Sequence, residues 1–161
     1  MTSRRAIVLA GLAGVMLGIV SMVVAQRDAL AQSRSARRVI RPDKGPNTGL
    51  PFSPGILVGS TLYISGHLGR DPSTNALVRG GIEAETRQSL ANIREVLKAA
   101  GMDFKDVTTV TAYIVSFTEF AKFNEIYRAT FPNDQPARAT VQVAALNDGA
   151  RVELQMIAVK P

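Results

Sequence analysis

The sequence predicts an α+β domain with the element order ββαβαββ, in which two helices cover one face of a mixed sheet. Three observations lead to this prediction. Two stretches place apolar residues at the three- and four-residue spacing of an amphipathic helix. Short runs of β-branched and aromatic residues flank them. Clusters of Gly, Pro, Asn and Asp separate the runs and indicate turns.

The first half of the domain begins with a hairpin signal. Gly55–Val58 and Thr61–Ser65 are short β-rich runs joined by a Gly-Ser pair. Gly66–Gly81 is rich in turn residues and is expected to be a loop. From residue 82 to residue 100, apolar side chains fall on one stripe and charged ones on the rest, which predicts an amphipathic helix ended by Gly101.

The second half adds one helix and three strands. Val107–Val115 is a run of β-branched and aromatic residues and predicts a strand. Phe120, Phe123 and Tyr127 then mark the apolar stripe of a second helix, which is expected to end before Pro132. The last two strands are predicted at residues 137–146 and 151–159.

Side chains alternate between the two faces of a strand, and this divides residues 137–146 into two sets. We expect the small apolar set (Ala137, Ala139, Val141, Val143, Ala145) to pack under the helices. Arg138 and Thr140 would then lie on the opposite face, together with Glu153 of the last strand. In a hairpin of these two strands, Arg138 and Glu153 would be about 20 Å apart, at roughly 3.3 Å per residue. They could share a site only if different subunits supply them.

The composition limits the possible functions. The chain has 161 residues, no cysteine and one histidine, so disulfides, thiolate catalysis and cysteine metal sites are excluded. The formal net charge of +6 lies entirely in residues 1–44, whereas residues 45–161 hold eleven basic and eleven acidic side chains. Because the domain is neutral, a nucleic-acid surface is not predicted. We expect neither a metal nor a cofactor.

The N-terminal residues 1–31 resemble an export signal. A basic start is followed by an uncharged apolar run from Ala6 to Ala25 and by Ala29-Leu30-Ala31, which has the A-x-A pattern of a cleavage site. We expect cleavage after Ala31, with Ala25 as an alternative position. An uncleaved membrane anchor is the competing interpretation, because the run is long enough to span a bilayer. Either way, we expect a periplasmic or otherwise exported domain.

Residues 32–48 are rich in Arg, Ser, Pro and Gly and are expected to be a flexible basic linker. The domain is expected to occupy residues 49–161.

Five sequence blocks in this domain resemble the RidA family, also called YjgF, of 2-iminobutanoate/2-iminopropanoate deaminases. The blocks are LYISGHLGRDP, ETRQSLANIREVLKAAGMDFKDV, FAKFNEIYRATFP, PARATVQVAAL and VELQMIAV. The resemblance implies a chorismate-mutase-like domain that forms a homotrimer with ligand clefts between subunits. In such a fold, the strand at residues 107–115 should separate the last two strands.

The resemblance also implies roles for particular residues. Arg138 would bind the carboxylate of a 2-imino acid, as the planar guanidinium suits bidentate recognition. Glu153 would position the attacking water and shuttle a proton. Ser65 and Gly66 match the Ser-Gly pair of the family's cleft, and Asn124 matches its helix asparagine.

Three positions depart from the family pattern. Phe52 stands where the family has a tyrosine, so a phenolic hydroxyl is missing. Thr140 stands where a cysteine is often found, and it can still donate a hydrogen bond. His67 replaces the usual glutamine. We expect carboxylate binding to survive the loss of the tyrosine and of the cysteine.

These residues leave three functional hypotheses. The first is hydrolytic deamination of reactive 2-imino or enamino acids to 2-keto acids and ammonia. The second is a non-catalytic trimeric module that binds small carboxylates or unfolded chains. The third is the endoribonuclease activity ascribed to some relatives, which the neutral charge of the domain disfavours.

Overall fold

The computed structural model describes residues 21–27, 36–43 and 51–160. It divides the chain into two units, Met1–Ala36 and Arg37–Pro161. In the first unit, residues 21–27 are helical, and the rest of the proposed signal or anchor lies outside the described residues. No helix within the described ranges combines the length and apolar character needed to cross a membrane.

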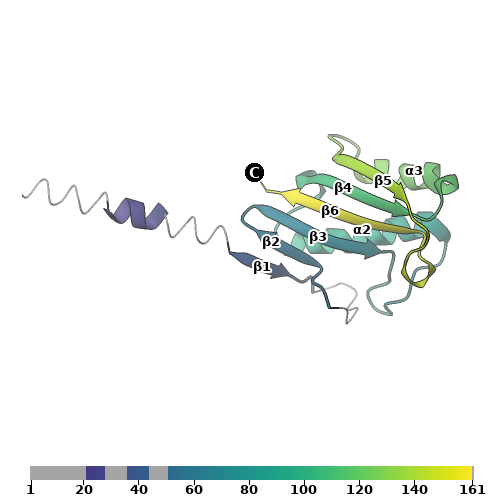
Figure 1. Cartoon of the computed structure of the whole chain (residues 1–161), viewed down its shortest axis with the longest axis horizontal. Helices are drawn as coiled ribbons and strands as arrows, with labels where there is room; N and C mark the ends of the chain where they lie inside the picture. The colour runs from purple at the N-terminus through teal and green to yellow at the C-terminus, as the bar shows by residue number, and fades with distance from the viewer. Residues whose placement is uncertain (1–20, 28–35, 44–50, 161) are drawn as a thin grey trace, which may run out of the picture. The chain divides into compact units, whose positions relative to one another are not determined.

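The second unit is built on a six-stranded mixed sheet with the order β1-β2-β3-β6-β4-β5 (Figure 1). The neighbouring strands are antiparallel except β4 and β5, which are parallel. The strands are β1 (Arg37–Ile40), β2 (Gly55–Val58), β3 (Thr61–Leu68), β4 (Val107–Ile114), β5 (Ala137–Gln142) and β6 (Val152–Val159). The helices are α2 (Gly81–Ala99) and α3 (Phe120–Thr130), with short 3-10 turns at Phe104–Asp106, Phe117–Glu119 and Asn147–Gly149.

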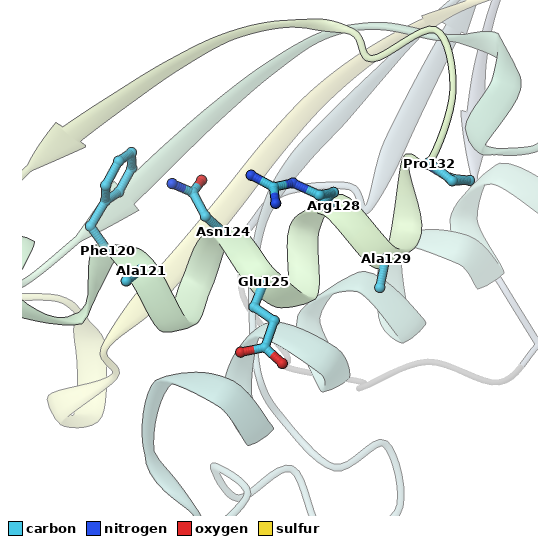
Figure 2. Close-up of a pocket in the computed structure, with 7 residues that line it drawn as sticks. All are labelled: Phe120, Ala121, Asn124, Glu125, Arg128, Ala129 and Pro132. Atoms are coloured by element: carbon cyan, nitrogen blue, oxygen red, sulfur yellow. The ribbon is translucent and has the colours of Figure 1, made fainter.

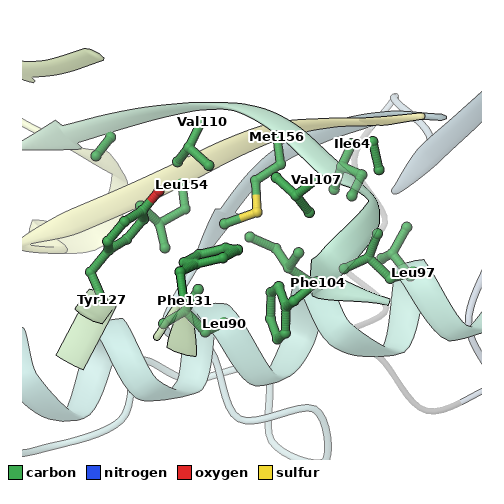
Figure 3. Packing of buried hydrophobic residues seen from close by; sticks show 14 of the residues in the cluster. Ile64, Leu90, Leu97, Phe104, Val107, Val110, Tyr127, Phe131, Leu154 and Met156 are labelled. Atoms are coloured by element: carbon green, nitrogen blue, oxygen red, sulfur yellow. The ribbon is translucent and has the colours of Figure 1, made fainter. Parts of the chain in front are cut away.

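The predicted α+β architecture is confirmed, since α2 and α3 cover the same face of the sheet (Figure 1). The core lies between these helices and the central strands (Figure 3). It is formed by the apolar stripes of the helices and by alternate residues of β3, β4 and β6, among them Ile64, Leu97, Val110, Phe123, Leu154 and Met156. The prediction that the strand at 107–114 separates the last two strands is also confirmed.

Three predicted boundaries are wrong. Residues 37–40, expected in the flexible linker, form β1 and pair with β2, and Ile40 is buried in the core. The Thr61–Ser65 strand continues to Leu68, because an irregularity between Ile64 and His67 lets it pair further with β6. The strand expected up to Leu146 ends at Gln142. It forms no hairpin with β6, because β4 lies between β5 and β6.

The predicted facing of β5 is also wrong. Arg138 is in register with Val110 and Thr140 with Ala112, and both of these β4 residues are buried under the helices. Arg138 and Thr140 therefore lie on the helix face, and the small apolar residues lie on the open face. The reversal is physically possible because β5 is the last strand of the sheet, where the guanidinium reaches the aromatic side chains of α3 and also solvent.

Candidate functional site

Arg138 lies against one side of α3. Its Nη2 donates a hydrogen bond of 2.7 Å to the Oδ1 of Asn124. The guanidinium carbon stands 4.3 Å from the ring centre of Tyr127 and 5.3 Å from that of Phe123. Such cation–π contacts hold a cation without neutralising it. No acidic side chain pairs with Arg138 among the described residues, so its charge is available to an anionic ligand.

A shallow hollow opens beside this guanidinium. Its volume is about 430 Å³, and it is lined by Asn124, Tyr127, Arg128, Gln135, Pro136 and Arg138. A second hollow of about 750 Å³ continues along α3 and shares Asn124 and Arg128 with the first (Figure 2). Figure 2 shows these two side chains extending to the same side of the helix. The hollows thus place amide and guanidinium groups around one space.

Two hydroxyl groups behind Arg138 are buried without a partner, namely the Oη of Tyr127 and the Oγ1 of Thr140. Burial raises the pKa of Tyr127 to about 12, although the nearby positive charge of Arg138 acts in the opposite direction. Tyr127 is therefore neutral at physiological pH and offers Arg138 an aromatic face rather than a phenolate.

Glu153 and Gly66 form a second group on β6 and β3. The Oε1 of Glu153 lies where a side chain on Gly66 would begin, since a Cβ there would be 1.8 Å from this oxygen. Burial raises the pKa of the Glu153 carboxyl above its ordinary value. Residue 66 must consequently be glycine for the carboxylate to keep this position, close to the backbone and half-buried.

Ser65 connects this second group to the segment that carries Phe52. Its Oγ donates a hydrogen bond of 2.6 Å to the carbonyl of Ser53, and its backbone N–H donates one of 3.0 Å to the carbonyl of Pro54. Phe52 itself is half exposed. Ser65 therefore has a positioning role in this chain, because it anchors the segment entering β2.

The predicted site residues fall into two groups that lie apart in one chain. Arg138, Asn124 and Thr140 belong to the helix face at the β5 edge. Glu153 is on the open face, as its strand neighbours Val152 and Leu154 are buried under the helices. One chain therefore does not bring the predicted carboxylate-binding arginine and the predicted water-positioning glutamate together. Within the described residues, no group of three or more His, Asp or Glu side chains could hold a metal ion.

The family model described as Endoribonuclease L-PSP matches residues 43–160. The chain belongs to this RidA/YjgF family. The family match covers the whole described sheet except β1, together with both helices.

Among curated RidA/YjgF relatives, the human protein named 2-iminobutanoate/2-iminopropanoate deaminase is 45% identical over 124 residues, covering 77% of this chain and 90% of the relative. A RutC family protein of Pyrococcus horikoshii is 39% identical over 77% of this chain and 98% of its own. RidA from an Antarctic Psychrobacter superposes with a TM-score of 0.73 at 38% identity, covering 76% and 99% of the two chains. The structure of E. coli TdcF with bound serine superposes with a TM-score of 0.73 at 29% identity, covering 77% of this chain and 99% of that chain.

Sequence reasoning missed the surroundings of Arg138. Phe123 and Tyr127 were assigned only to the apolar stripe of a helix, and the amphipathic spacing did not reveal that they also support a cation. The sequence did not indicate that Arg128 and Gln135 line a hollow, because exposed polar residues next to a loop are common.

Proposed function

We propose that this protein hydrolyses 2-imino or enamino acids to 2-keto acids and ammonia. The observation that carries the proposal is the uncompensated guanidinium of Arg138, held by Asn124 beside an open hollow. The names of the curated relatives, which print 2-iminobutanoate/2-iminopropanoate deaminase, support the same reaction class.

In this proposal Arg138 binds the substrate carboxylate. A guanidinium offers parallel N–H donors to a planar carboxylate and keeps its charge at any physiological pH. The hydrogen bond to Asn124 and the ring of Tyr127 fix the plane of the guanidinium before the ligand arrives. Less conformational freedom is then lost on binding.

Glu153 positions the water that attacks the imine carbon. Water adds its oxygen to this carbon and forms a carbinolamine, a proton moves to the nitrogen, and ammonia leaves as the carbonyl forms. A carboxylate whose pKa is raised by burial can accept the proton from water and return it to the leaving nitrogen. Gly66 leaves the space that this carboxylate needs.

The two halves of the site are proposed to meet between subunits of a homotrimer. Within one chain, Glu153 and Arg138 lie on opposite faces of the sheet, so a complete site requires residues from two chains. The open face also exposes large apolar residues, namely Tyr63 (51% exposed), Val141 (44%) and Val159 (37%), which a neighbouring subunit would cover.

The test is a coupled assay of imine hydrolysis, in which an amino-acid oxidase generates 2-iminopropanoate. We expect Arg138→Ala to abolish the acceleration, with Arg87→Ala of α2 as the matched control that removes an exposed arginine elsewhere. Full activity in Arg138→Ala would refute the mechanism.

The intersubunit site is tested by mixing chains that carry Arg138→Ala with chains that carry Glu153→Gln. Activity should return in the mixture, and its absence would contradict the shared site.

We further propose that residues 1–31 export the domain, either as a cleaved signal or as an uncleaved anchor. The basic start, apolar run and A-x-A pattern support this proposal. Cell fractionation and the mass of the mature N-terminus test it, and an intact chain recovered in the cytoplasm would refute it.

A second candidate is a trimeric module that binds carboxylates without turnover. Phe52 and Thr140 favour this candidate. Phe52 lacks the phenolic hydroxyl of the family tyrosine, and Thr140 lacks the thiol of the cysteine often found at its position. Carboxylate binding that depends on Arg138, measured without any acceleration of hydrolysis, would support this candidate over the enzyme.

A further inference from the structure

We propose that Arg128 makes the hollow beside Arg138 selective for ligands with a second acidic group, that is, for the 2-imino acids derived from dicarboxylic amino acids. This inference rests on the proposed function and specifies its substrate class. The basis is the lining of the hollow, which contains two guanidinium groups, two amides and no carboxylate.

The positions of the two arginines suit a ligand with two acidic groups. Asn124 accepts a hydrogen bond from Arg138, which places it beside the first guanidinium. Arg128 follows Asn124 by one helical turn, so their Cβ atoms are about 5–6 Å apart on the same side of α3. Figure 2 shows the guanidinium of Arg128 directed along the helix toward Asn124. A short dicarboxylate bound to Arg138 can therefore present its distal carboxylate to Arg128.

The charges around the hollow are unbalanced. Within the described part of the chain, the ion pairs use Arg70, Lys98, Lys122 and Arg151, and neither Arg128 nor Arg138 takes part. The nearest acid on the helix, Glu125, points away from Arg128 in Figure 2. A monocarboxylate neutralises one of the two positive charges, whereas a dicarboxylate neutralises both.

Solvent limits the size of the effect, because Arg128 is exposed. Exposed ion pairs are weak and screened by salt, so we expect Arg128 to favour a dicarboxylate by about fivefold at low ionic strength. The preference should shrink as salt is added.

The test compares kcat/KM for imines generated from alanine and from glutamate. Arg128→Gln should lower the value for the glutamate-derived imine by about fivefold and change that for the alanine-derived imine less than about twofold. The matched control is Lys122→Gln, which removes one positive charge from the same helix but outside the hollow, where Lys122 faces Glu83 at 3.7 Å. It should leave both values unchanged. Equal losses for both imines, or no loss, in Arg128→Gln would overturn the inference.

A binding measurement separates this inference from the proposed function. Calorimetric titration with 2-oxoglutarate and with pyruvate, the corresponding keto acids, needs no turnover. Tighter binding of 2-oxoglutarate that is lost in Arg128→Gln supports the inference even if wild-type protein hydrolyses neither imine, a result that would reject only the proposed function. Equal affinity for the two keto acids, or a preference unchanged in Arg128→Gln, overturns it.

Discussion

His67 should make the domain less stable in mild acid. Its side chain lies on the helix-facing part of β3, in register with buried Leu154, and its Nε2 is buried without a hydrogen-bond partner. Burial lowers the pKa of His67 from 6.5 to about 4, although a hydrogen bond from the imidazole to the backbone carbonyl of Pro54 acts in the opposite direction. The folded protein therefore holds the imidazole neutral over a range in which the unfolded chain protonates it.

The sign and the size follow from this pKa difference. Above pH 6.5 the imidazole is neutral in both states, and its full contribution to stability is present. As the pH falls from 6.5 toward 4, the unfolded chain binds the proton more readily and the free energy of unfolding decreases. At about 1.4 kcal/mol per pH unit, the total loss is about 3 kcal/mol.

The assay is urea unfolding at about pH 7.5 and about pH 4.5, for the wild type and for His67→Gln. Glutamine cannot titrate. The wild type should lose about 3 kcal/mol more than the variant between these pH values. Glu85 and Glu153 have raised pKa values because they are buried, and they shift stability in the opposite direction, but both are present in both proteins. Parallel pH profiles for the two proteins would refute the reasoning.

Two further predictions concern the candidate site. Gly66→Ala should reduce imine hydrolysis at least about tenfold, because the alanine Cβ displaces the Glu153 carboxylate. The melting temperature should barely change, since the displaced atoms are the flexible end of that side chain. In a Glu153→Gln background the same change should cost no further activity, and a further loss would contradict this explanation. Tyr127→Phe should leave the free energy of unfolding unchanged or raise it by up to about 1 kcal/mol, because the phenolic hydroxyl is buried without a partner. Urea unfolding measures this, and a clear loss of stability would show that the hydroxyl is satisfied.

Periodicity predicted the order of the elements because burial of one face leaves a repeating pattern in the chain. It missed β1, in which Ile40 is the one buried residue of four and the arginines around it looked like a linker. The pattern also divided β5 correctly into two sets of side chains. It could not tell which set faces the helices, because at the edge of a sheet small apolar residues can lie on the open face.

The resemblance pointed to individual residues of the candidate site but not to their arrangement in space. The resemblance selected Arg138 and Asn124, and the structure joins them by a hydrogen bond. It also selected Gly66 and Glu153, which the structure brings into direct proximity. That these pairs lie on opposite faces depends on strand order and register, which a single sequence does not encode locally.

Under the proposed function, the position of Arg138 would also couple ligand binding to the stability of the outermost strand. β5 is held by β4 on one side only, and through Arg138 it is attached to α3 by the hydrogen bond to Asn124 and by contact with the helix's aromatic rings. An anion that binds this guanidinium would add a further contact to the folded strand. It would therefore stabilise β5 paired with β4 relative to the locally unfolded strand. The outermost strand thereby becomes a reporter of binding, and slower amide exchange along it would follow ligand concentration.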